Sequence, residues 1–175
     1  LLNILDKFDF ADFPLLKEDN YKGPLDVVFV EGCITKEEQK EELLRARKRS
    51  DYLIAFGTCA TYGGVPTIKS FLDTEYETEE IFDQPNIMKQ IAATGIDKFV
   101  DVDYFLRGCP PEKHEIINIL KDLLAERKPK QIDYPVCVEC RKRENVCLLQ
   151  QGEPCIGPLT YAGCKALCPS IGVPC

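Results

Sequence analysis

The chain has 175 residues and a formal net charge of −7, and 45% of its residues are hydrophobic. This length fits one ordinary domain, or a medium domain with a small appendage, and the hydrophobic fraction is high enough for a packed core. An acidic chain has no basic stripe to neutralise phosphates, which argues against nucleic acid as a partner. The sequence contains no apolar run of roughly eighteen residues, so no membrane span is expected.

The N-terminal part predicts a helix end, a strand and a further helix. Residues 1–8 carry apolar side chains at helical spacing, and a short extended piece is expected at residues 11–16. Residues 25–30 (LDVVFV) are mostly β-branched or aromatic, which is typical of a strand buried on both sides in a parallel sheet. Thr35 and Glu38 have the spacing of a capping box, and a helix is predicted from there to about Arg49.

The middle of the chain predicts a second and a third strand. Residues 52–56 form the second apolar run, and the glycine-rich residues 57–64 that follow would let the backbone approach another group closely. Residues 73–83 are strongly acidic and predict a solvated loop. A helix is expected at residues 87–94, and the third strand at residues 98–103.

The last predicted helix covers residues 112–126 and follows two prolines, a favoured residue at helix starts. Residues 128–134 then link to the tail. The repeated order of strand, turn and helix predicts an α/β fold with a flavodoxin-like, doubly wound parallel sheet. We expect this domain at residues 1–130 and a small, irregular, cysteine-rich domain at residues 131–175.

Three cysteines lie where functional groups of such a sheet gather, at the carboxyl ends of the strands. Cys33, Cys59 and Cys109 each follow a predicted strand and precede a predicted helix, so all three could meet at one edge. Glycines and prolines surround Cys59 and Cys109, and we expect these two to be functional. For Cys33 a buried free thiol is the expected role.

The other seven of the ten cysteines lie in the last 39 residues. Cys137 and Cys140 form a C-x-x-C pair, and Cys164 and Cys168 form a C-x-x-x-C-P run like the end of the bacterial ferredoxin motif. Glycines and prolines between the sulfurs leave little periodicity for an apolar core. We therefore expect metal–thiolate bonds to hold this segment together, with iron–sulfur clusters as the favoured centre.

Two alternatives for the cysteines stay open. An even number of cysteines is compatible with five disulfides in a secreted protein, although disulfide-dense scaffolds are usually shorter. A structural zinc site could use four thiolates of the tail, from Cys137, Cys140, Cys147 and Cys155. The zinc alternative would make the chain a non-redox interaction module on a flavodoxin-like domain, and would leave Cys59 and Cys109 unexplained.

The motifs together resemble a known family. Residues 57–66 (GTCATYGGVP) and residues 107–112 (RGCPPE) look like the small, electron-transferring subunit of [NiFe] hydrogenases, and the cysteine pattern of the tail is similar to the cluster region of that family. The likeness covers nearly the whole chain. It is closest to the cytosolic subgroup that reduces methyl viologen or a deazaflavin coenzyme, or is sulfhydrogenase-like. A cluster-bearing subunit of respiratory complex I is the related alternative, and the cysteine-rich tail argues against it.

The resemblance implies three [4Fe-4S] clusters and assigns nine cysteines to them. The sets are Cys59 and Cys109 for the proximal cluster, Cys137, Cys140, Cys147 and Cys155 for the distal cluster, and Cys164, Cys168 and Cys175 for the medial cluster. In the family the proximal cluster also uses an upstream C-x-x-C pair, and the medial cluster a further cysteine. We therefore expect the natural chain to be longer than the given sequence.

The implied function is electron transfer in an oxidoreductase complex, in the cytoplasm. Electrons would pass from the nickel–iron centre of a large subunit through the clusters to a flavoprotein, a ferredoxin-like protein or a heterodisulfide-reductase-type subunit. No catalytic residue is expected in this chain. His114, the only histidine, is expected at the surface or in a helix cap.

Overall fold

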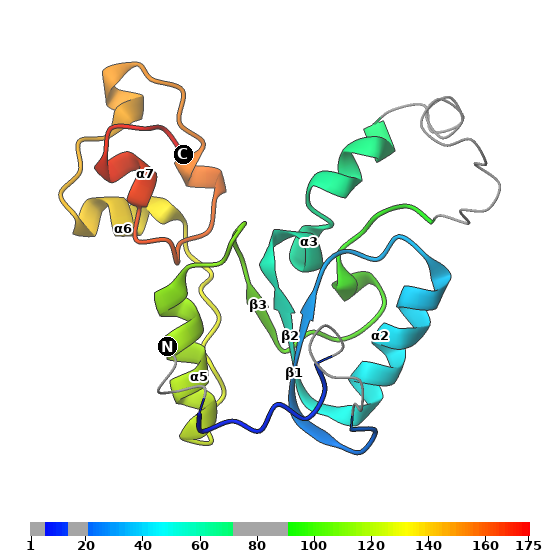
Figure 1. The fold of residues 1–175 in the computed structure, drawn as a ribbon. Coiled ribbons are helices and arrows are strands. Elements are labelled where there is room, and N and C mark those ends of the chain that lie inside the picture. The colour runs from blue at the N-terminus through cyan, green and yellow to red at the C-terminus, as the bar shows by residue number, and fades with distance from the viewer. Residues whose placement is uncertain (1–5, 14–20, 72–90) are drawn as a thin grey trace. The chain divides into compact units, whose positions relative to one another are not determined.

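The computed structural model describes residues 6–13, 21–71 and 91–175. The chain forms two compact units, Leu1–Pro110 and Pro111–Cys175 (Figure 1). The boundary expected from the sequence, at residue 130, lies inside the second of these units. A division into a flavodoxin-like domain and a cluster domain at that point stays a prediction.

A parallel three-stranded sheet organises the first unit, and it confirms the predicted α/β fold class. The strands are β1 (Leu25–Glu31), β2 (Ser50–Phe56) and β3 (Tyr104–Leu106), with β2 in the middle. The central strand is the buried one: Leu53 and Ile54 are both 0% exposed. The prediction that residues 25–30 are buried on both sides is wrong for the described part of the chain, because β1 lies at the sheet's edge and alternates in exposure.

Two helices flank the central strand in sequence. The helix α2 (Glu37–Arg49) leads into β2, and the short helix α3 (Gly57–Tyr62) follows it directly. The predicted capping box named Glu38 as the side chain that accepts backbone hydrogen bonds at the helix start, and this is wrong. Gln39 has that role: its Oε1 accepts the backbone N–H groups of Thr35 (2.9 Å) and Lys36 (3.1 Å).

The core of the first unit draws on both helices and on the sheet. Buried side chains form one cluster: Ile34, Leu43, Leu53, Ala55, Ala60 and Ile96. Burying a leucine or isoleucine side chain contributes about 1.5–3 kcal/mol. Because Ala60 belongs to this cluster, α3 is fixed against the carboxyl end of β2.

The third strand begins later than the sequence predicted. The prediction of a strand at residues 98–103 is wrong: a 3₁₀ turn (Ile96–Lys98) and an irregular segment precede β3. Phe99, Val100 and Val102 pack on the core from this segment without pairing in the sheet. Their apolar character therefore reflects burial rather than strand pairing.

Several other predicted elements lie wholly or partly outside the described residues. These are the acidic loop at residues 73–83 and most of the N-terminal helix and extended piece; residues 6–8 form a turn. Of the helix predicted at residues 87–94, only residues 91–94 are described, and they are not helical. Instead, Thr94 forms an antiparallel bridge with Ile34, with backbone hydrogen bonds of 3.1 and 3.3 Å.

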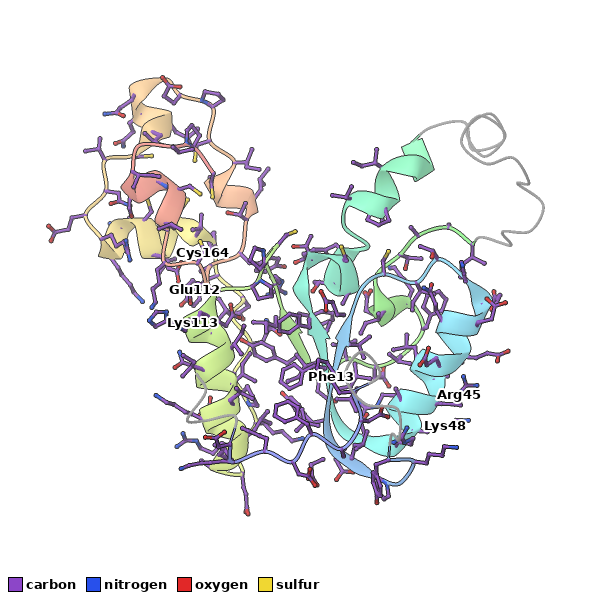
Figure 2. The ribbon with its side chains drawn as sticks, viewed as in Figure 1. Phe13, Arg45, Lys48, Glu112, Lys113 and Cys164 are labelled. Carbon is purple, nitrogen blue, oxygen red and sulfur yellow. The ribbon has the colours of Figure 1, made fainter. Side chains whose placement is uncertain are left out.

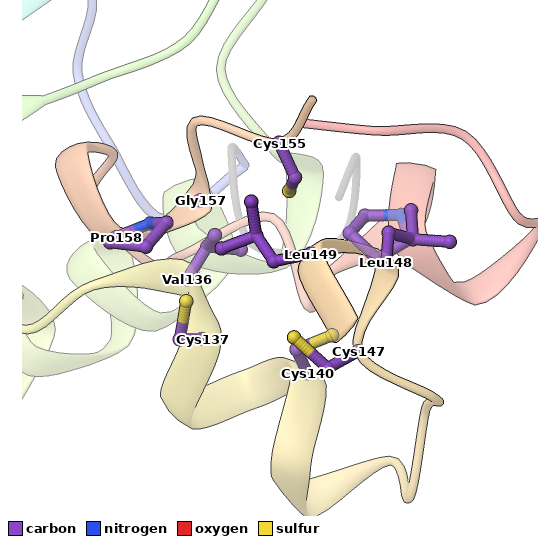
Figure 3. Close-up of a pocket in the computed structure, with 10 residues that line it drawn as sticks. Val136, Cys137, Cys140, Cys147, Leu148, Leu149, Cys155, Gly157 and Pro158 are labelled. Atoms are coloured by element: carbon purple, nitrogen blue, oxygen red, sulfur yellow. The ribbon is translucent and has the colours of Figure 1, made fainter. Parts of the chain in front are cut away.

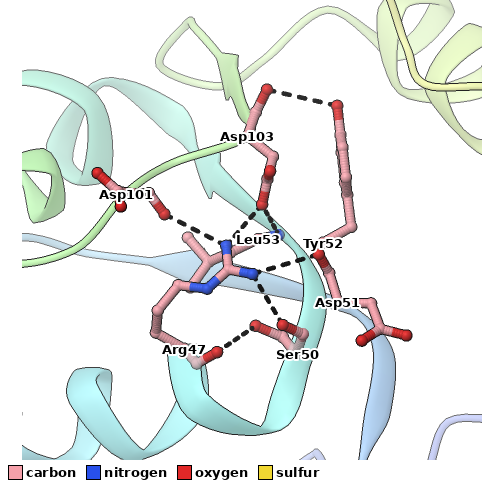
Figure 4. A network of polar contacts seen from close by, with 7 residues as sticks. All are labelled: Arg47, Ser50, Asp51, Tyr52, Leu53, Asp101 and Asp103. Atoms are coloured by element: carbon pink, nitrogen blue, oxygen red, sulfur yellow. Dashed lines mark hydrogen bonds and ion pairs between the residues drawn. The ribbon is translucent and has the colours of Figure 1, made fainter.

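A polar network ties the start of β2 to the segment that enters β3 (Figure 4). Asp103 Oδ2 accepts the backbone N–H of Leu53 (2.8 Å) and Arg47 Nη1 (2.5 Å). The backbone N–H of Asp103 donates to the Leu53 oxygen at 2.9 Å, so Asp103 pairs with Leu53 in both directions. Arg47 Nη2 also donates to the Ser50 oxygen at 2.8 Å. Burial and the neighbouring Asp103 carboxylate raise the pKa of Tyr52.

Short helices separated by irregular segments build the second unit. These are α5 (Lys113–Leu124), α6 (Val136–Lys142), a 3₁₀ turn (Leu148–Gln151), a second 3₁₀ turn (Gly157–Leu159) and α7 (Leu167–Ser170). The helix predicted at residues 112–126 is confirmed as α5. No helix among the described residues is long and apolar enough to cross a membrane.

His114 lies in the first turn of α5, as its predicted surface or capping role requires. Its imidazole is 63% exposed, and Nδ1 lies 2.9 Å from Glu112 Oε1. The other carboxylate oxygen of Glu112 accepts the backbone N–H groups of His114 (2.5 Å) and Glu115 (3.3 Å), which caps the helix. Burial acts to raise the pKa of Glu112, but the hydrogen bonds from His114 and Glu115 outweigh it and lower that pKa.

Replacing Asp103 with alanine removes the acceptor that the Leu53 N–H and Arg47 share. We expect the free energy of unfolding to fall by about 1–3 kcal/mol, because the Leu53 N–H loses its side-chain acceptor in a partly buried site and Arg47 loses its ion pair. Urea unfolding followed by circular dichroism measures the change. Asp101→Ala is the matched control, since Asp101 meets Arg47 through its backbone oxygen at 3.2 Å. Equal losses in the two variants would contradict the role given to the Asp103 carboxylate.

Candidate iron–sulfur sites

Four cysteines of the second unit line one cavity: Cys137, Cys140, Cys147 and Cys155. The first two come from α6, Cys147 precedes the 3₁₀ turn Leu148–Gln151, and Cys155 precedes the turn Gly157–Leu159. In Figure 3 Cys155 faces the other three across the cavity. The set predicted for the distal cluster is therefore brought together by three separate segments of the chain.

The cavity wall is apolar and leaves room for the sulfurs. Its other lining residues are Val136, Leu148, Leu149, Gly157, Pro158 and Pro169. A Cβ added at Gly157 would lie 3.3 Å from Cys137 Sγ and 3.5 Å from Cys155 Sγ. A side chain at position 157 would therefore press on the Cys137 sulfur and touch that of Cys155, and glycine keeps that space open.

The Cys137 thiol resists ionisation in this cavity. Burial raises the pKa of Cys137, and the neighbouring Cys140, Cys155 and Cys147 raise it further. Four thiolates around one apolar cavity require a cationic centre, because metal binding deprotonates cysteine and offsets their mutual repulsion. The residues present therefore fit a thiolate-ligated metal group.

Two hydrogen bonds are donated to sulfurs that line this cavity. Asn145 Nδ2 donates to Cys140 Sγ at 3.5 Å, and the backbone N–H of Cys175 donates to Cys155 Sγ at 3.4 Å. Such bonds are one of the means by which proteins tune iron–sulfur clusters. Within the described residues no group of three or more His, Cys, Asp or Glu side chains has the geometry to hold a metal ion. The four cysteines nevertheless line one cavity together.

The three remaining cysteines of the tail lie near one another. Burial raises the pKa of Cys175, a hydrogen bond with Thr160 lowers it, and the nearby Cys164, Cys155 and Cys168 raise it again, with the net direction upward. Thr160 Oγ1 lies 3.7 Å from Cys175 Sγ. Cys164 and Cys168 are exposed, and Cys168 lies in α7.

Cys59 and Cys109 lie in the first unit, beyond the carboxyl ends of β2 and β3. Their segments are joined by a hydrogen bond of 2.9 Å from the backbone N–H of Thr58 to the oxygen of Gly108. Cys59 lies inside α3, whereas the sequence predicts it ahead of a helix. Cys33 follows β1 and is only partly buried, so its role as a buried thiol stays a prediction.

One glycine of the glycine-rich residues 57–64 lies close to the Cys59 sulfur. A Cβ at Gly64 would lie 2.6 Å from Cys59 Sγ, and the residue has a φ of +62°. The expectation that glycine lets the backbone approach another group is confirmed, and that group is the cysteine of the same motif.

Sequence reasoning missed the residues that surround the sulfurs. Asn145 and Thr160 contact cysteines that lie 5 and 15 positions away along the chain. Nothing in their local sequence marks them, because their partners are set by how the irregular segments fold. Gly157 is one of eleven glycines and equally unmarked.

A family model described as NADH ubiquinone oxidoreductase, 20 Kd subunit, matches residues 1–123. The chain belongs to this family. It is 36% identical to sulfhydrogenase 2 subunit delta of Pyrococcus furiosus, over all of this chain and 74% of that protein. It is 33% identical to a subunit of the F420-non-reducing hydrogenase vhu of Methanocaldococcus jannaschii, over all of this chain and 72% of that protein.

A solved structure shares the fold. A chain in the crystal structure of an NAD+-reducing [NiFe]-hydrogenase in its hydrogen-reduced state superimposes with a TM-score of 0.63 at 27% identity, covering 74% of this chain and 80% of that one. The family model ends before the cysteine-rich tail, whereas the hydrogenase relatives match the whole chain. The predicted membership of the hydrogenase electron-transfer subunits, which are parts of oxidoreductase complexes, is thereby confirmed.

Replacing Gly64 with alanine should disturb Cys59. Both the new Cβ at 2.6 Å from the sulfur and the strained φ act against the folded state, and overpacking of this kind costs about 1–3 kcal/mol. We expect a lower unfolding midpoint and loss of metal bound through Cys59.

Gly32→Ala is the matched control for this substitution. Its φ of +89° imposes a similar backbone strain, but nothing lies within 4 Å of the added Cβ. Urea unfolding and iron analysis of both variants separate the two effects. Equal destabilisation of the two variants, with unchanged iron, would contradict the steric role of Gly64.

Proposed function

We propose that this chain is the electron-transfer subunit of a [NiFe] hydrogenase. It relays electrons, one at a time, between the nickel–iron centre of a large subunit and an acceptor subunit, through three [4Fe-4S] clusters. The observation that carries the proposal is the gathering of Cys137, Cys140, Cys147 and Cys155 around one apolar cavity. The relatives named as hydrogenase subunits support it independently.

Nine cysteines hold the clusters on this proposal. Cys59 and Cys109 belong to the proximal cluster, and the four cavity cysteines to the distal one. The medial cluster takes Cys164, Cys168 and Cys175.

The residues of this chain act by holding and tuning sulfur. A bound cluster supplies one-electron chemistry, and the hydrogen splitting itself takes place in another chain. Asn145 and the backbone N–H of Cys175 donate to the sulfurs of Cys140 and Cys155. Donors to thiolate sulfur stabilise the more negative, reduced state and so raise the reduction potential.

The partners follow from the same assignment. One is the large subunit, and the other is an electron acceptor: a flavoprotein, a ferredoxin-like protein or a heterodisulfide-reductase-type subunit. The named relatives differ in this respect, since they include a sulfhydrogenase and an F420-non-reducing hydrogenase. We propose a cytoplasmic complex without a membrane-spanning segment in this subunit.

Metal analysis of the complex, purified without oxygen, tests the assignment. Three four-iron clusters require roughly twelve irons and as many acid-labile sulfides per copy of this chain, after the iron of partners is subtracted. Stoichiometric nickel is expected from the large subunit. Zinc near one per chain with little iron would overturn the electron-transfer role and leave a zinc-stapled module; iron without nickel would move the chain to a different enzyme.

A ligand substitution locates one cluster. Cys147→Ser should remove about four irons per chain, because it deletes one of four thiolates from a single cluster. Cys33→Ser is the control, since Cys33 lies outside the three sets, and it should keep the full iron content. Iron loss in both variants, or in neither, would contradict the assignment of the four-cysteine set.

A further inference from the structure

The loop that carries Cys164 has an unusual backbone. Gly163 has a φ of +125°, and the two residues after the cysteine, Lys165 and Ala166, have φ values of +58° and +50°. Left-handed backbone is unfavourable at residues with a Cβ. Such a conformation persists only where its surroundings hold it.

A single carboxylate holds this loop at both ends. Glu139 Oε1 accepts the backbone N–H of Gly163 at 3.0 Å, and its Oε2 accepts the backbone N–H of Ala166 at 3.2 Å. Hydrogen bonds from a backbone N–H to a carboxylate are about twice as strong as neutral ones. The backbone N–H groups of Gly163 and Ala166 thus point toward one carboxylate, which is how backbone concavities bind anions.

Glu139 itself belongs to the other cysteine set. It lies in α6 between Cys137 and Cys140, the C-x-x-C pair of the four-cysteine cavity. One side chain therefore connects the helix that presents two sulfurs of one set to the loop that presents Cys164 of the other.

Further contacts fix the loop around Glu139. Ser170 Oγ donates to the Ala166 oxygen at 2.7 Å, and Asn145 Nδ2 donates to Ser170 Oγ at 3.0 Å. On another side, a Cβ at Gly163 would lie 2.6 Å from Glu115 Oε2, so α5 limits where the loop can go. Figure 2 shows Cys164 beside the start of α5, where Glu112 and Lys113 are labelled.

We propose that Glu139 is a positioning residue for the set of Cys164, Cys168 and Cys175. Its carboxylate sets the conformation of residues 163–166, and so places the Cys164 sulfur, while its own backbone is part of the neighbouring four-cysteine site. The two cysteine sets of the tail are thereby built as one assembly. The role of these sulfurs as cluster ligands rests on the proposed function; the hold of Glu139 on the loop does not.

The shape of the side chain matters as well as its charge. Both oxygens of Glu139 accept, so a glutamine keeps one acceptor and turns an N–H₂ group toward the other backbone N–H. Alanine removes both acceptors. The order of loop stability should therefore be wild type, then Glu139→Gln, then Glu139→Ala.

Amide hydrogen exchange of the intact complex, read by mass spectrometry on peptides covering residues 163–168, tests the proposal without reference to activity. Glu139→Ala should speed exchange in this segment by about tenfold, the change expected when charge-assisted bonds to two amides are lost. Glu139→Gln should give an intermediate rate. Glu144→Gln is the matched control, because Glu144 is exposed, lies in the same unit and loses the same charge.

Iron analysis and electron paramagnetic resonance on the same samples give the second readout. Glu139→Ala should lose up to one cluster, roughly four irons per chain, from the Cys164 set. Glu139→Gln should raise the reduction potential of the cluster bound by that set, because a negative charge is removed. Exchange and iron in both Glu139 variants equal to those of Glu144→Gln would overturn the proposal. Wild-type complex without iron would instead overturn the proposed function, while the exchange rates would still decide the role of Glu139.

Discussion

The mutual repulsion of thiolates in an apolar cavity is the constraint on which the second unit depends. Cys137, Cys140, Cys147 and Cys155 come from three segments that have few buried side chains of their own, so sulfur must supply much of what holds them. Four negative charges gathered around one apolar cavity are unfavourable without a cation. On the proposed function, metal binding and folding of this part of the chain are coupled, as they are in other small metal-stapled domains.

The first unit depends on a different arrangement. Its central strand β2 is buried. Before β3 begins, the Asp103 carboxylate accepts the backbone N–H of Leu53 in β2, in place of a backbone oxygen. This determines where β3 enters the sheet and hence where the chain emerges toward Cys109. The hydrogen bond between Thr58 and Gly108 then aligns the two cysteine-bearing segments at one sheet edge.

The sequence was most informative where a residue's role depends on its near neighbours. The apolar run of β2 and the capped start of α5 are local patterns, and the spacing of Cys137 and Cys140 on one helix is another. It was least informative where the partner is distant. The valines at 100 and 102 look like strand residues, yet they pack on the core from an irregular segment. Hydrophobic periodicity in a sequence indicates which residues are buried, and burial alone does not specify strand pairing.

The same distinction applies to the candidate sites. The family resemblance implied which cysteines group together, and the cavity of the second unit is lined by one of those groups. The donors to sulfur and the carboxylate that shapes the Cys164 loop were invisible, because each contact joins two segments whose meeting depends on the whole tail. Residues that tune a centre are for this reason harder to read from sequence than residues that bind it.

The hydrogen bond from Cys175 to Cys155 has a consequence for how such a protein can evolve. Its donor is a backbone N–H, so ordinary side-chain substitution leaves it in place, and only proline would delete it. The contact of Asn145 with Cys140, by contrast, is lost with a single codon change. Side-chain substitution therefore leaves the hydrogen bond to the Cys155 sulfur in place. The hydrogen bond to the Cys140 sulfur can differ between related proteins that use different electron acceptors.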